Sequence, residues 1–517
     1  MNKLRILWAD DEIEMLRSHV LFLENKGYEV ITATNGEDAL DFIEEQNFDI
    51  ILLDENMPGL TGIETLTRIK NNAPNMPVVM ITKSEEESIM EEAIGSKISD
   101  YLIKPVNPNQ ILLCLKKNLE NKRLVSDKTT HSYHMEFRQI GMEISPSLSW
   151  EEWKTLYKKI VGWELKLSES NDTEVMDILE MQKREANTAF VKYVERNYPS
   201  WLKDNNDTNP EMSHTLFRNK ILNTLGDGKK AFVLLIDNLR YDQWKTIQAV
   251  VEEQYRVEED DIYCSILPTV TQYSRNAFFS GLMPVEIQKK YPKHWFTEEE
   301  DEGKNKSEAF FLEEQLNRFG KKINFSYNKI LNINAAKKFV DQLPNLMKND
   351  LNVLVYNFVD MLSHARTEME MIKELADNEA AYRSLTLSWF KHSPLYEILS
   401  YLRSKNIALF ITTDHGSVKV SNPVKVVGNR NTNANLRYKT GKSLDYKQKE
   451  VYEVRKPEEI FLPKINVSSS YIFAKEHDFF AYPNNYNYYV NYYRDTFQHG
   501  GISMEEMMIP FISLLPK

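Results

Sequence analysis

Apolar runs in the second half of the chain are followed by aspartate and histidine side chains, and four such segments occur. In "LFITTDHGS", Asp414 and His415 stand side by side where an apolar, strand-like run stops. Adjacent strand residues point to opposite faces, but both can reach one crevice at a strand's carboxyl end, where open α/β sheets bind ligands. The six candidate ligands in these segments are Asp237, Asp360, His364, Asp414, His415 and His499.

Aspartate and histidine without thiolates form a ligand set that suits Zn²⁺, with Mn²⁺ or Fe²⁺ as alternatives. Six ligands are more than one four-coordinate ion needs, so the sequence predicts a site for two ions. Two ions about 4 Å apart can stabilise the attacking and the leaving oxygen of an in-line phosphoryl displacement. The pattern therefore indicates phosphoryl-transfer chemistry.

Such chemistry needs a nucleophile, and the segment "LPTVTQYSRNAFFSG" offers Thr269 and Thr271. Both lie near the expected N-terminus of a helix, where a metal ion lowers the pKa of a hydroxyl and backbone N–H groups receive phosphate oxygens. Spacing alone leaves the choice between them open. Arg275 lies one helical turn beyond Thr271 and either faces the same phosphate or forms a surface ion pair.

A basic segment, residues 426–442, offers further contacts for a substrate. It contains Arg430, Arg437 and Lys439 beside Tyr438. These side chains either clamp the phosphates and the base of a nucleotide or belong to a solvated basic loop. The sequence leaves both alternatives open.

The first part of the chain, residues 1–120, alternates strand-like and helix-like segments, which predicts a parallel sheet with helices on both faces. Asp10, Asp11 and Asp54 each follow an apolar run and should cluster at one edge of that sheet. Three crowded carboxylates call for a hard divalent cation, most simply Mg²⁺ with retained waters. Lys104, which follows a later strand, is placed to neutralise an added anion.

These residues resemble those of a response-regulator receiver domain. The resemblance rests on the acidic pair Asp10-Asp11, on "LLDENMPGLTG", on the residue after "VVMI", and on "YLIKP". The resemblance implies a flavodoxin-like fold and Asp54 as phospho-acceptor. It also implies that Thr82 and Lys104 contact the phosphoryl group and that Tyr101 is the aromatic switch. The implied Mg²⁺ ligands are Asp10, Asp11, Asp54 and the Asn56 carbonyl.

The middle of the chain, residues 121–205, is expected to form a helical linker or bundle. Ser149 is a candidate N-cap, and Glu152 stands three residues on, as in a capping box. These helices mix acidic and basic residues and contain no compact basic recognition helix, so a DNA-binding regulator is the less favoured alternative. The predicted domains are residues 1–120, 121–205 and 206–517.

The last domain, residues 206–517, resembles the PglZ-type branch of the alkaline phosphatase superfamily. The resemblance rests on "LLIDNLRYDQW", "PTVTQYSRNAFFSG", "FVDMLSHAR", "ITTDHGS" and "FQHGGISMEEMMIP". It implies an α/β sandwich with Thr271 as nucleophile, a residue more typical of diesterase than of monoesterase members. The implied Zn²⁺ ligands are Asp237, Thr271, Asp414 and His415 for one ion, and Asp360, His364 and His499 for the other.

The order receiver, helical segment, phosphatase-like domain resembles PorX-type response regulators of Bacteroidetes, which are linked to type IX secretion and gliding. The resemblance implies a cytoplasmic location, a sensor histidine kinase and an extracytoplasmic-function sigma factor as partners, and phosphodiesterase action on cyclic and linear oligonucleotides. We also expect a phosphorylation-dependent homodimer. The alternative is a non-catalytic regulator that works through protein contacts, with a structural or ligand-sensing metal domain.

The composition agrees with a multidomain globular protein. The chain has 517 residues, 42% hydrophobic and 27% charged, and about three domains are expected at the usual domain size. Its net charge of −12 argues against broad nucleic-acid coating. No apolar run of about 18 residues predicts a membrane span, and the N-terminal segment is unlike a signal peptide. Cys114 and Cys264 have no metal-ligand spacing and are expected to be reduced core residues.

Overall fold

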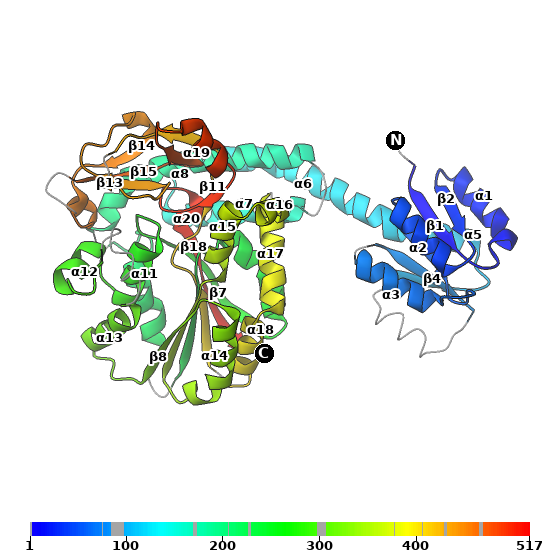
Figure 1. The fold of residues 1–517 in the computed structure, drawn as a ribbon, viewed down its shortest axis with the longest axis horizontal. Helices are drawn as coiled ribbons and strands as arrows, with labels where there is room; N and C mark the ends of the chain where they lie inside the picture. Colours follow the sequence, from blue (N-terminus) through cyan, green and yellow to red (C-terminus); the bar gives the residue numbers. More distant parts are fainter. Residues whose placement is uncertain are drawn as a thin grey trace. The chain divides into compact units, whose positions relative to one another are not determined.

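A computed structural model gives the fold of the chain (Figure 1). The chain divides into two compact units, Met1–Tyr133 and His134–Lys517. None of the helices in the described part of the chain has both the length and the apolarity that a membrane crossing needs. The described residues are 3–74, 76–83, 98–168, 173–204, 206–225, 229–296, 307–376, 378–405, 407–428, 432–464 and 469–517.

The first unit contains a five-stranded parallel sheet in the order β2-β1-β3-β4-β5. Its strands are β1 (Arg5–Ala9), β2 (Glu29–Ala33), β3 (Ile50–Asp54), β4 (Val78–Thr82) and β5 (Asp100–Ile103). Its helices include α1 (Arg17–Asn25), α2 (Gly36–Glu45), α3 (Gly62–Asn72) and α5 (Pro108–Leu115).

Alternate residues of the central strands pack into two separate apolar cores, one on each face of the sheet. Trp8 and Leu52 belong to one core, and Leu7 and Leu53 belong to the other. Both faces are therefore covered, as an all-parallel sheet requires. The predicted flavodoxin-like fold of the receiver is confirmed.

The second unit is built on a six-stranded sheet in the order β7-β18-β10-β6-β9-β8. The strands β10, β6, β9 and β8 run parallel, whereas β18 is antiparallel to both of its neighbours. Every residue of β6 and β9 is buried, which explains why β6 reads as a continuous apolar run and β9 as an apolar run interrupted by Asn352. The strands are β6 (Ala231–Ile236), β7 (Tyr255–Cys264), β8 (Phe325–Ile330), β9 (Leu351–Tyr356), β10 (Ala408–Thr412) and β18 (Met508–Pro516).

Helices and short strands complete the second unit. Its smaller sheets pair β11 with β17, β12 with β16, and β13 with β15 and β14. The short strands are β11 (Val418–Lys419), β12 (Asn422–Lys425), β13 (Tyr438–Gly441), β14 (Val451–Val454), β15 (Ser470–Ala474), β16 (Asp478–Ala481) and β17 (Phe497–Gln498). The helices are α6 (Asn121–Glu143), which begins in the first unit, α7 (Trp150–Ser168), α8 (Thr173–Trp201), α9 (Ser213–Leu216), α10 (Tyr241–Glu252), α11 (Thr271–Ser280), α12 (Pro284–Lys290), α13 (Glu308–Arg318), α14 (Ile333–Leu346), α15 (Phe358–Glu368), α16 (Glu370–Leu375), α17 (Glu379–His392), α18 (Pro394–Arg403), α19 (Tyr486–Tyr493) and α20 (Met504–Met507).

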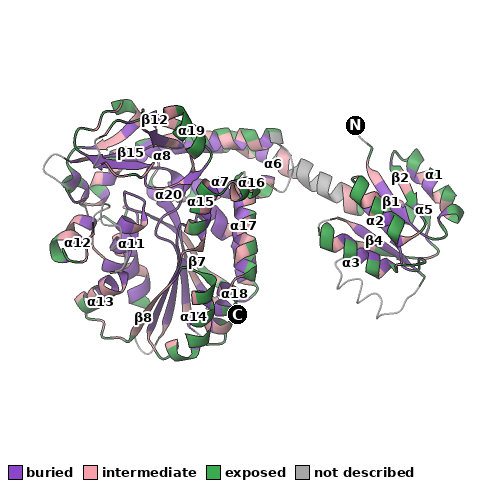
Figure 2. Cartoon of the chain, in the orientation of Figure 1, coloured by how far each residue is buried: buried purple, intermediate pink, exposed green. Residues whose placement is uncertain are grey.

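The linker helices, α7 and α8, belong to the second compact unit rather than forming a unit of their own. The predicted capping box at the start of α7 is present, with the backbone N–H of Ser149 donating to Glu152 at 2.8 Å. Trp153 and Ile160 on α7 are fully buried, so this helix turns an aromatic and apolar stripe inward. Figure 2 colours the buried residues of the unit purple. This packing explains why the helices do not separate from the sheet that follows them.

A buried ion network also ties the linker helices to the rest of the unit. Lys183 on α8 lies 3.1 Å from Glu164 on α7, 3.3 Å from Glu505 and 3.6 Å from Glu379. Arg383 contacts Glu164 as well. Charges this deeply buried are tolerated only when each has a partner. The network therefore holds α7 and α8 against α17 and the segment before β18.

Both cysteines are buried and free, as predicted from the sequence. Burial raises the pKa of the Cys114 thiol to about 12, and it raises that of Cys264 as well. Both thiols are therefore protonated and unreactive at neutral pH.

Replacing Lys183 with methionine should destabilise the second unit by about 3 kcal/mol or more, because it leaves the Glu164 and Glu505 carboxylates buried without this counter-charge. The matched control is Arg184→Met, which removes a half-exposed pair with Glu180 and should cost less than about 1 kcal/mol. Urea unfolding monitored by tryptophan fluorescence measures both. Equal stability of the two variants would contradict a structural role for the network.

Candidate active site

Three of the predicted metal ligands, Asp237, Asp414 and His415, form what we name group 1. Asp237 directly follows β6, and the other two follow β10, the strand that pairs with β6 in parallel. Their ligand atoms all lie within 4.8 Å of one another, and each residue is at most 1% exposed. The shared carboxyl edge of two parallel strands therefore brings these side chains together, as the sequence predicts.

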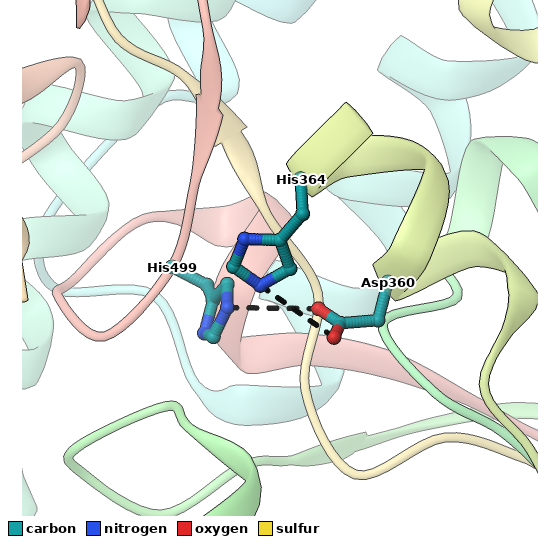
Figure 3. A group of neighbouring side chains, drawn as sticks. All are labelled: Asp360, His364 and His499. Atoms are coloured by element: carbon teal, nitrogen blue, oxygen red, sulfur yellow. Dashed lines mark ion pairs between the residues drawn. The ribbon is translucent and has the colours of Figure 1, made fainter. Parts of the chain in front are cut away.

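Asp360, His364 and His499 form group 2, whose ligand atoms also lie within 4.8 Å of one another. Asp360 and His364 are one turn apart on α15, and His499 follows β17 (Figure 3). The Nε2 atoms of His364 and His499 lie 3.6 Å and 3.7 Å from the Asp360 carboxylate oxygens. The His364 side chain is 61% exposed, whereas group 1 is enclosed. Group 2 is therefore the side from which a ligand can approach.

The two groups are immediate neighbours. The His415 and His499 rings stack with their centroids 4.2 Å apart. Asn238, which follows Asp237 in a left-handed conformation that asparagine tolerates, places its amide nitrogen 3.4 Å from Asp360 Oδ1. The six side chains thus line one continuous site. Asn238 is a contact that the sequence did not single out.

The structure distinguishes the two candidate threonines. Thr271 is the first residue of α11, and its Oγ1 lies 3.2 Å from His415 Nε2. The Thr269 hydroxyl is fully buried, donates to the Gly501 carbonyl at 3.2 Å, and accepts a hydrogen bond from the Gly500 N–H at 2.9 Å. Of these two hydroxyls, therefore, the one that faces a metal-ligand group belongs to Thr271.

The first unit contains a second cluster of carboxylates, Asp10, Asp11 and Asp54, whose ligand atoms lie within 4.8 Å of one another. Lys104 Nζ lies 2.9 Å from Asp10 Oδ2 and 2.9 Å from Asp54 Oδ1. Burial raises the pKa of Asp54, and the hydrogen bond from Lys104 opposes that rise. One ammonium among three carboxylates leaves two negative charges uncompensated, which fits a divalent cation such as Mg²⁺.

The remaining receiver residues lie around this cluster. Thr82, the last residue of β4, donates a hydrogen bond to Glu55. Tyr101 on β5 is 36% exposed, and Asn56 is exposed directly after Asp54 and Glu55. The predicted switch residues thus lie on β4 and β5, the strands that follow the acceptor strand β3 in the sheet, with Tyr101 on the surface.

Comparison with known protein families divides the chain into three parts. Residues 6–116 match the response regulator receiver domain, and residues 123–202 match the PorX response regulator linker domain. Residues 216–514, more than half of the chain, match the BREX system PglZ alkaline phosphatase-like domain. This chain belongs to the PglZ family. The three matches together give the PorX-type architecture: a two-component response regulator with a PglZ output domain, whose receiver implies a phosphodonor such as a sensor kinase.

Individual relatives match only part of the chain. The transcriptional regulatory protein ZraR of Klebsiella oxytoca is 35% identical over 136 residues, which are 26% of this chain and 31% of ZraR. The transcriptional regulatory protein ResD of Bacillus subtilis is 35% identical over 115 residues, 22% of this chain and 48% of ResD. The structure of the chemotaxis protein CheY4 of Vibrio cholerae has 30% identity and a TM-score of 0.22, covering 23% of this chain and 100% of CheY4. The chain thus spans less than half of the two regulators.

Two of the candidate ligands, His415 and His499, are in the form that binds a metal ion. Nδ1 of His415 lies 3.2 Å from the Gly416 carbonyl, and Nδ1 of His499 lies 3.1 Å from the Thr269 carbonyl. Each Nδ1–H donates to that carbonyl, so Nε2 keeps its lone pair and faces the carboxylates. Burial lowers the pKa of both imidazoles to about 4, so both are neutral at pH 7.

The carboxylates of group 1 share a buried arginine. Burial raises the pKa of Asp414 to about 7 even though Arg275 opposes it. Burial acts in the same direction on Asp237, but the charge and hydrogen bond of Arg275 outweigh it and hold the pKa below its usual range. Arg275 also contacts a third buried carboxylate, Glu308, and the partly exposed Lys329 approaches only Glu308 among these three. The buried cluster therefore remains net negative and fits a bound cation.

A free carboxylate oxygen supports the same conclusion. Asp237 Oδ1 is buried without a hydrogen-bond partner and lies 3.7 Å from the Nε2 atom of His415. A buried carboxylate oxygen beside an imidazole lone pair is unfavourable unless a cation lies between them. Aspartate oxygens and imidazole nitrogens are a donor set that suits Zn²⁺. Group 1 therefore fits the metal ion that the sequence predicts.

The glycine of "TTDHGS" has a steric reason. A Cβ atom on Gly416 would lie 2.0 Å from the Glu505 carbonyl oxygen, so no side chain fits there. Its backbone N–H donates to the Glu506 carbonyl at 3.2 Å. The segment after His499 therefore lies directly against the segment that carries His415, and this close approach helps to set the two groups side by side.

The predicted substrate contacts need correction. Arg275 is fully buried, so the predicted alternative of a surface ion pair is wrong. Arg437 is also fully buried, and its Nη2 lies 2.6 Å from Glu506 Oε2. Lys439 is 1% exposed and donates to the Asn433 carbonyl at 2.7 Å. The prediction of a solvated basic loop is therefore wrong for Arg437 and Lys439, because both side chains are buried and bind other groups of the protein. Arg430 lies outside the described residues.

Single ligand replacements in the PglZ domain should each reduce the bound zinc from about two ions to about one per chain. Asp237→Ala removes a carboxylate of group 1, and His499→Ala removes an imidazole of group 2. Elemental analysis of the purified full-length variants measures the metal content, with the exposed His134 replaced by alanine as the matched control. A wild-type chain without bound transition metal would contradict the assignment.

Proposed function

We propose that this chain is a response regulator whose PglZ domain is a two-zinc phosphodiesterase that acts on cyclic and linear oligonucleotides. The observation that carries the proposal is the position of Thr271, whose hydroxyl lies 3.2 Å from His415 Nε2 beside the two adjacent ligand groups. A hydroxyl, six N/O ligands and a helix N-terminus meet at one site. That combination suits phosphoryl transfer better than it suits a purely structural metal site.

In this proposal each group holds one Zn²⁺, with the Thr271 hydroxyl as a further ligand of group 1. The bound ions would lower the pKa of that hydroxyl and stabilise the negative charge on the transferring phosphoryl oxygens. The ten-residue helix α11 directs its N-terminal backbone N–H groups, the positive end of the helix dipole, towards the same phosphate.

The reaction would proceed in two displacements. In the first, Thr271 Oγ forms a bond to phosphorus while the bond from phosphorus to the leaving oxygen breaks. The hydroxyl proton of Thr271 passes to solvent, and the leaving alkoxide takes up a proton from water. The intermediate is a threonyl phosphodiester that keeps the other ester arm of the substrate. In the second displacement, water forms a bond to its phosphorus while the bond from phosphorus to Thr271 Oγ breaks, which releases a phosphomonoester product and restores the threonine hydroxyl.

Control of this activity is assigned to Asp54 phosphorylation. Mg²⁺ bound by the carboxylate cluster would support transfer from a sensor histidine kinase. A cavity of about 450 Å³ opens beside Lys104, and its lining joins apolar residues to charged and polar ones, which supports docking of an amphipathic partner helix next to the acceptor. The lining residues are Glu12, Met15, Leu16, His19, Lys83, Lys104, Pro105 and Val106. The further parts of the proposal are a cytoplasmic location, an extracytoplasmic-function sigma factor as partner, and a link to type IX secretion.

Thr271→Val should reduce phosphodiesterase turnover by about three orders of magnitude or more, because it keeps the volume of the side chain and removes the nucleophile. Turnover is measured with chromogenic diesters and with cyclic oligonucleotides. The matched control is Thr269→Val, which removes a buried hydroxyl that holds Gly500 and Gly501 in place but does not face a ligand group.

Thr269→Val should therefore retain measurable turnover and show a lower melting temperature. Equal turnover in the wild type and Thr271→Val would contradict the nucleophile. No turnover in the wild type, with two zinc ions bound, would favour the alternative of a non-catalytic regulator.

Phosphorylation of Asp54 should convert the chain from monomer to dimer. The added charge is expected to draw Thr82 and Lys104 towards the phosphoryl group and to shift Tyr101, which together with Ile103 is exposed on β5. Such a shift acts only by changing an equilibrium, and self-association through this face is the simplest one. Sedimentation velocity with Mg²⁺ and beryllofluoride measures it.

Two variants make this experiment specific. Asp54→Ala removes the acceptor and should remain monomeric with beryllofluoride, whereas Lys104→Ala should respond weakly. An unchanged monomer peak for the wild type, with beryllofluoride bound, would rule out the dimer.

A further inference from the structure

Arg275 is placed behind the ligands of group 1 rather than in front of them. It lies one turn beyond Thr271 on α11, so both residues are on the same side of that helix. The side chain of Arg275 is fully buried, whereas Thr271 is partly exposed. The guanidinium therefore reaches the site from the protein interior, where no substrate can touch it.

Each nitrogen of this guanidinium is directed at a carboxylate. Nη2 contacts Asp237 Oδ2, Nε lies 2.9 Å from Asp414 Oδ2, and Nη1 lies 3.4 Å from Glu308 Oε1. These carboxylates come from three separate elements: the end of β6, the end of β10 and the start of α13. A planar guanidinium with nitrogens in fixed directions suits such a bridge, and a lysine ammonium offers no comparable geometry.

We infer that Arg275 is a positioning residue for the group 1 metal ion, an inference that rests on the proposed two-zinc site. By holding the Oδ2 atoms of Asp237 and Asp414, it fixes the orientation of both carboxylates. Asp237 Oδ1 is left without a hydrogen-bond partner and faces the Nε2 atom of His415. The contact thus presents one chosen oxygen to the ion, as residues behind metal ligands commonly do.

Glu308 keeps the guanidinium in place from the far side. It is 1% exposed and accepts a hydrogen bond of 2.5 Å from the Tyr327 hydroxyl, while Lys329 Nζ approaches at 3.3 Å. Arg275 is therefore held between the group 1 carboxylates and Glu308, and Glu308 is in turn held by Tyr327 and Lys329. In the described part of the chain, no arginine forms an ion pair with a residue of group 2, whose ion pairs join Asp360 to His364 and His499.

The test compares zinc affinity at each group separately in the full-length chain. His499→Ala disables group 2 and reports on group 1, whereas Asp237→Ala disables group 1 and reports on group 2. Zinc is titrated into the chelator-stripped protein in competition with a chromophoric chelator. Arg275→Lys should weaken binding about 10- to 100-fold in the His499→Ala background, the usual cost of losing a residue that orients a ligand. Binding should change less than about two-fold in the Asp237→Ala background.

Arg383→Lys is the matched control, because Arg383 is also buried and paired with carboxylates but contacts neither group. It should lower the melting temperature without changing zinc affinity in either background. A purely structural role for Arg275 would give the same result. Unchanged zinc affinity for Arg275→Lys in the His499→Ala background would therefore overturn the inference.

A second variant covers the case in which Arg275→Lys fails to fold. Glu308→Gln keeps the shape of the anchor and weakens its hold on the guanidinium, so group 1 should lose about three- to ten-fold in zinc affinity. Unchanged affinity in this variant, when Arg275→Lys is unfolded, would also overturn the inference. If the wild-type chain itself bound no zinc, the proposed function would fail, and the inference with it.

Discussion

The structure depends at both of its chemical sites on the crowding of buried carboxylates around too few positive charges. In the receiver, Lys104 stands among Asp10, Asp11 and Asp54. In the PglZ domain, Arg275 is shared by Asp237, Asp414 and Glu308. Each arrangement leaves negative charge that the protein does not neutralise itself, and burial makes that charge costly. A divalent cation is the simplest remedy, and both sites are shaped to accept one.

Parallel strands bring these carboxylates together, which is why so much of the site could be predicted from the sequence. A strand that is buried on both faces reads as an apolar run, and the acid that follows marks its carboxyl end. Neighbouring parallel strands share that edge, so Asp237 and Asp414 meet although 177 positions separate their numbers. His364 could be predicted equally well, because one helical turn separates it from Asp360. The acidic cluster of the receiver and five of the six candidate ligands of the PglZ domain follow from these two rules, whereas His499 follows a two-residue antiparallel strand, β17.

Charge partners within the core could not be predicted in this way. The sequence shows the helical spacing between Arg275 and Thr271, which predicts a surface arginine or one that binds substrate. It does not show the partner of Arg275, because Glu308 begins another helix 33 residues later. The same holds for Arg437 and Glu506, which are 69 residues apart and pair inside the domain. No periodicity relates such partners, since tertiary packing alone decides which opposite charges meet. Burial reverses the usual expectation for a charged side chain only after its partner is known.

The buried charge pairs of the linker helices limit how a signal from the receiver can act on the PglZ domain. Lys183 and Glu164 join a network that also contains Arg240, three residues after Asp237, and Glu505, six residues after His499. Separating these helices from the PglZ domain would leave several buried charges without partners, which costs far more than a regulatory step supplies. The linker and the phosphatase-like domain therefore respond to a signal as one body. A signal from the receiver therefore acts more simply by changing how whole chains associate. Opening a gap between the linker helices and the sheet would require breaking the buried ion pairs.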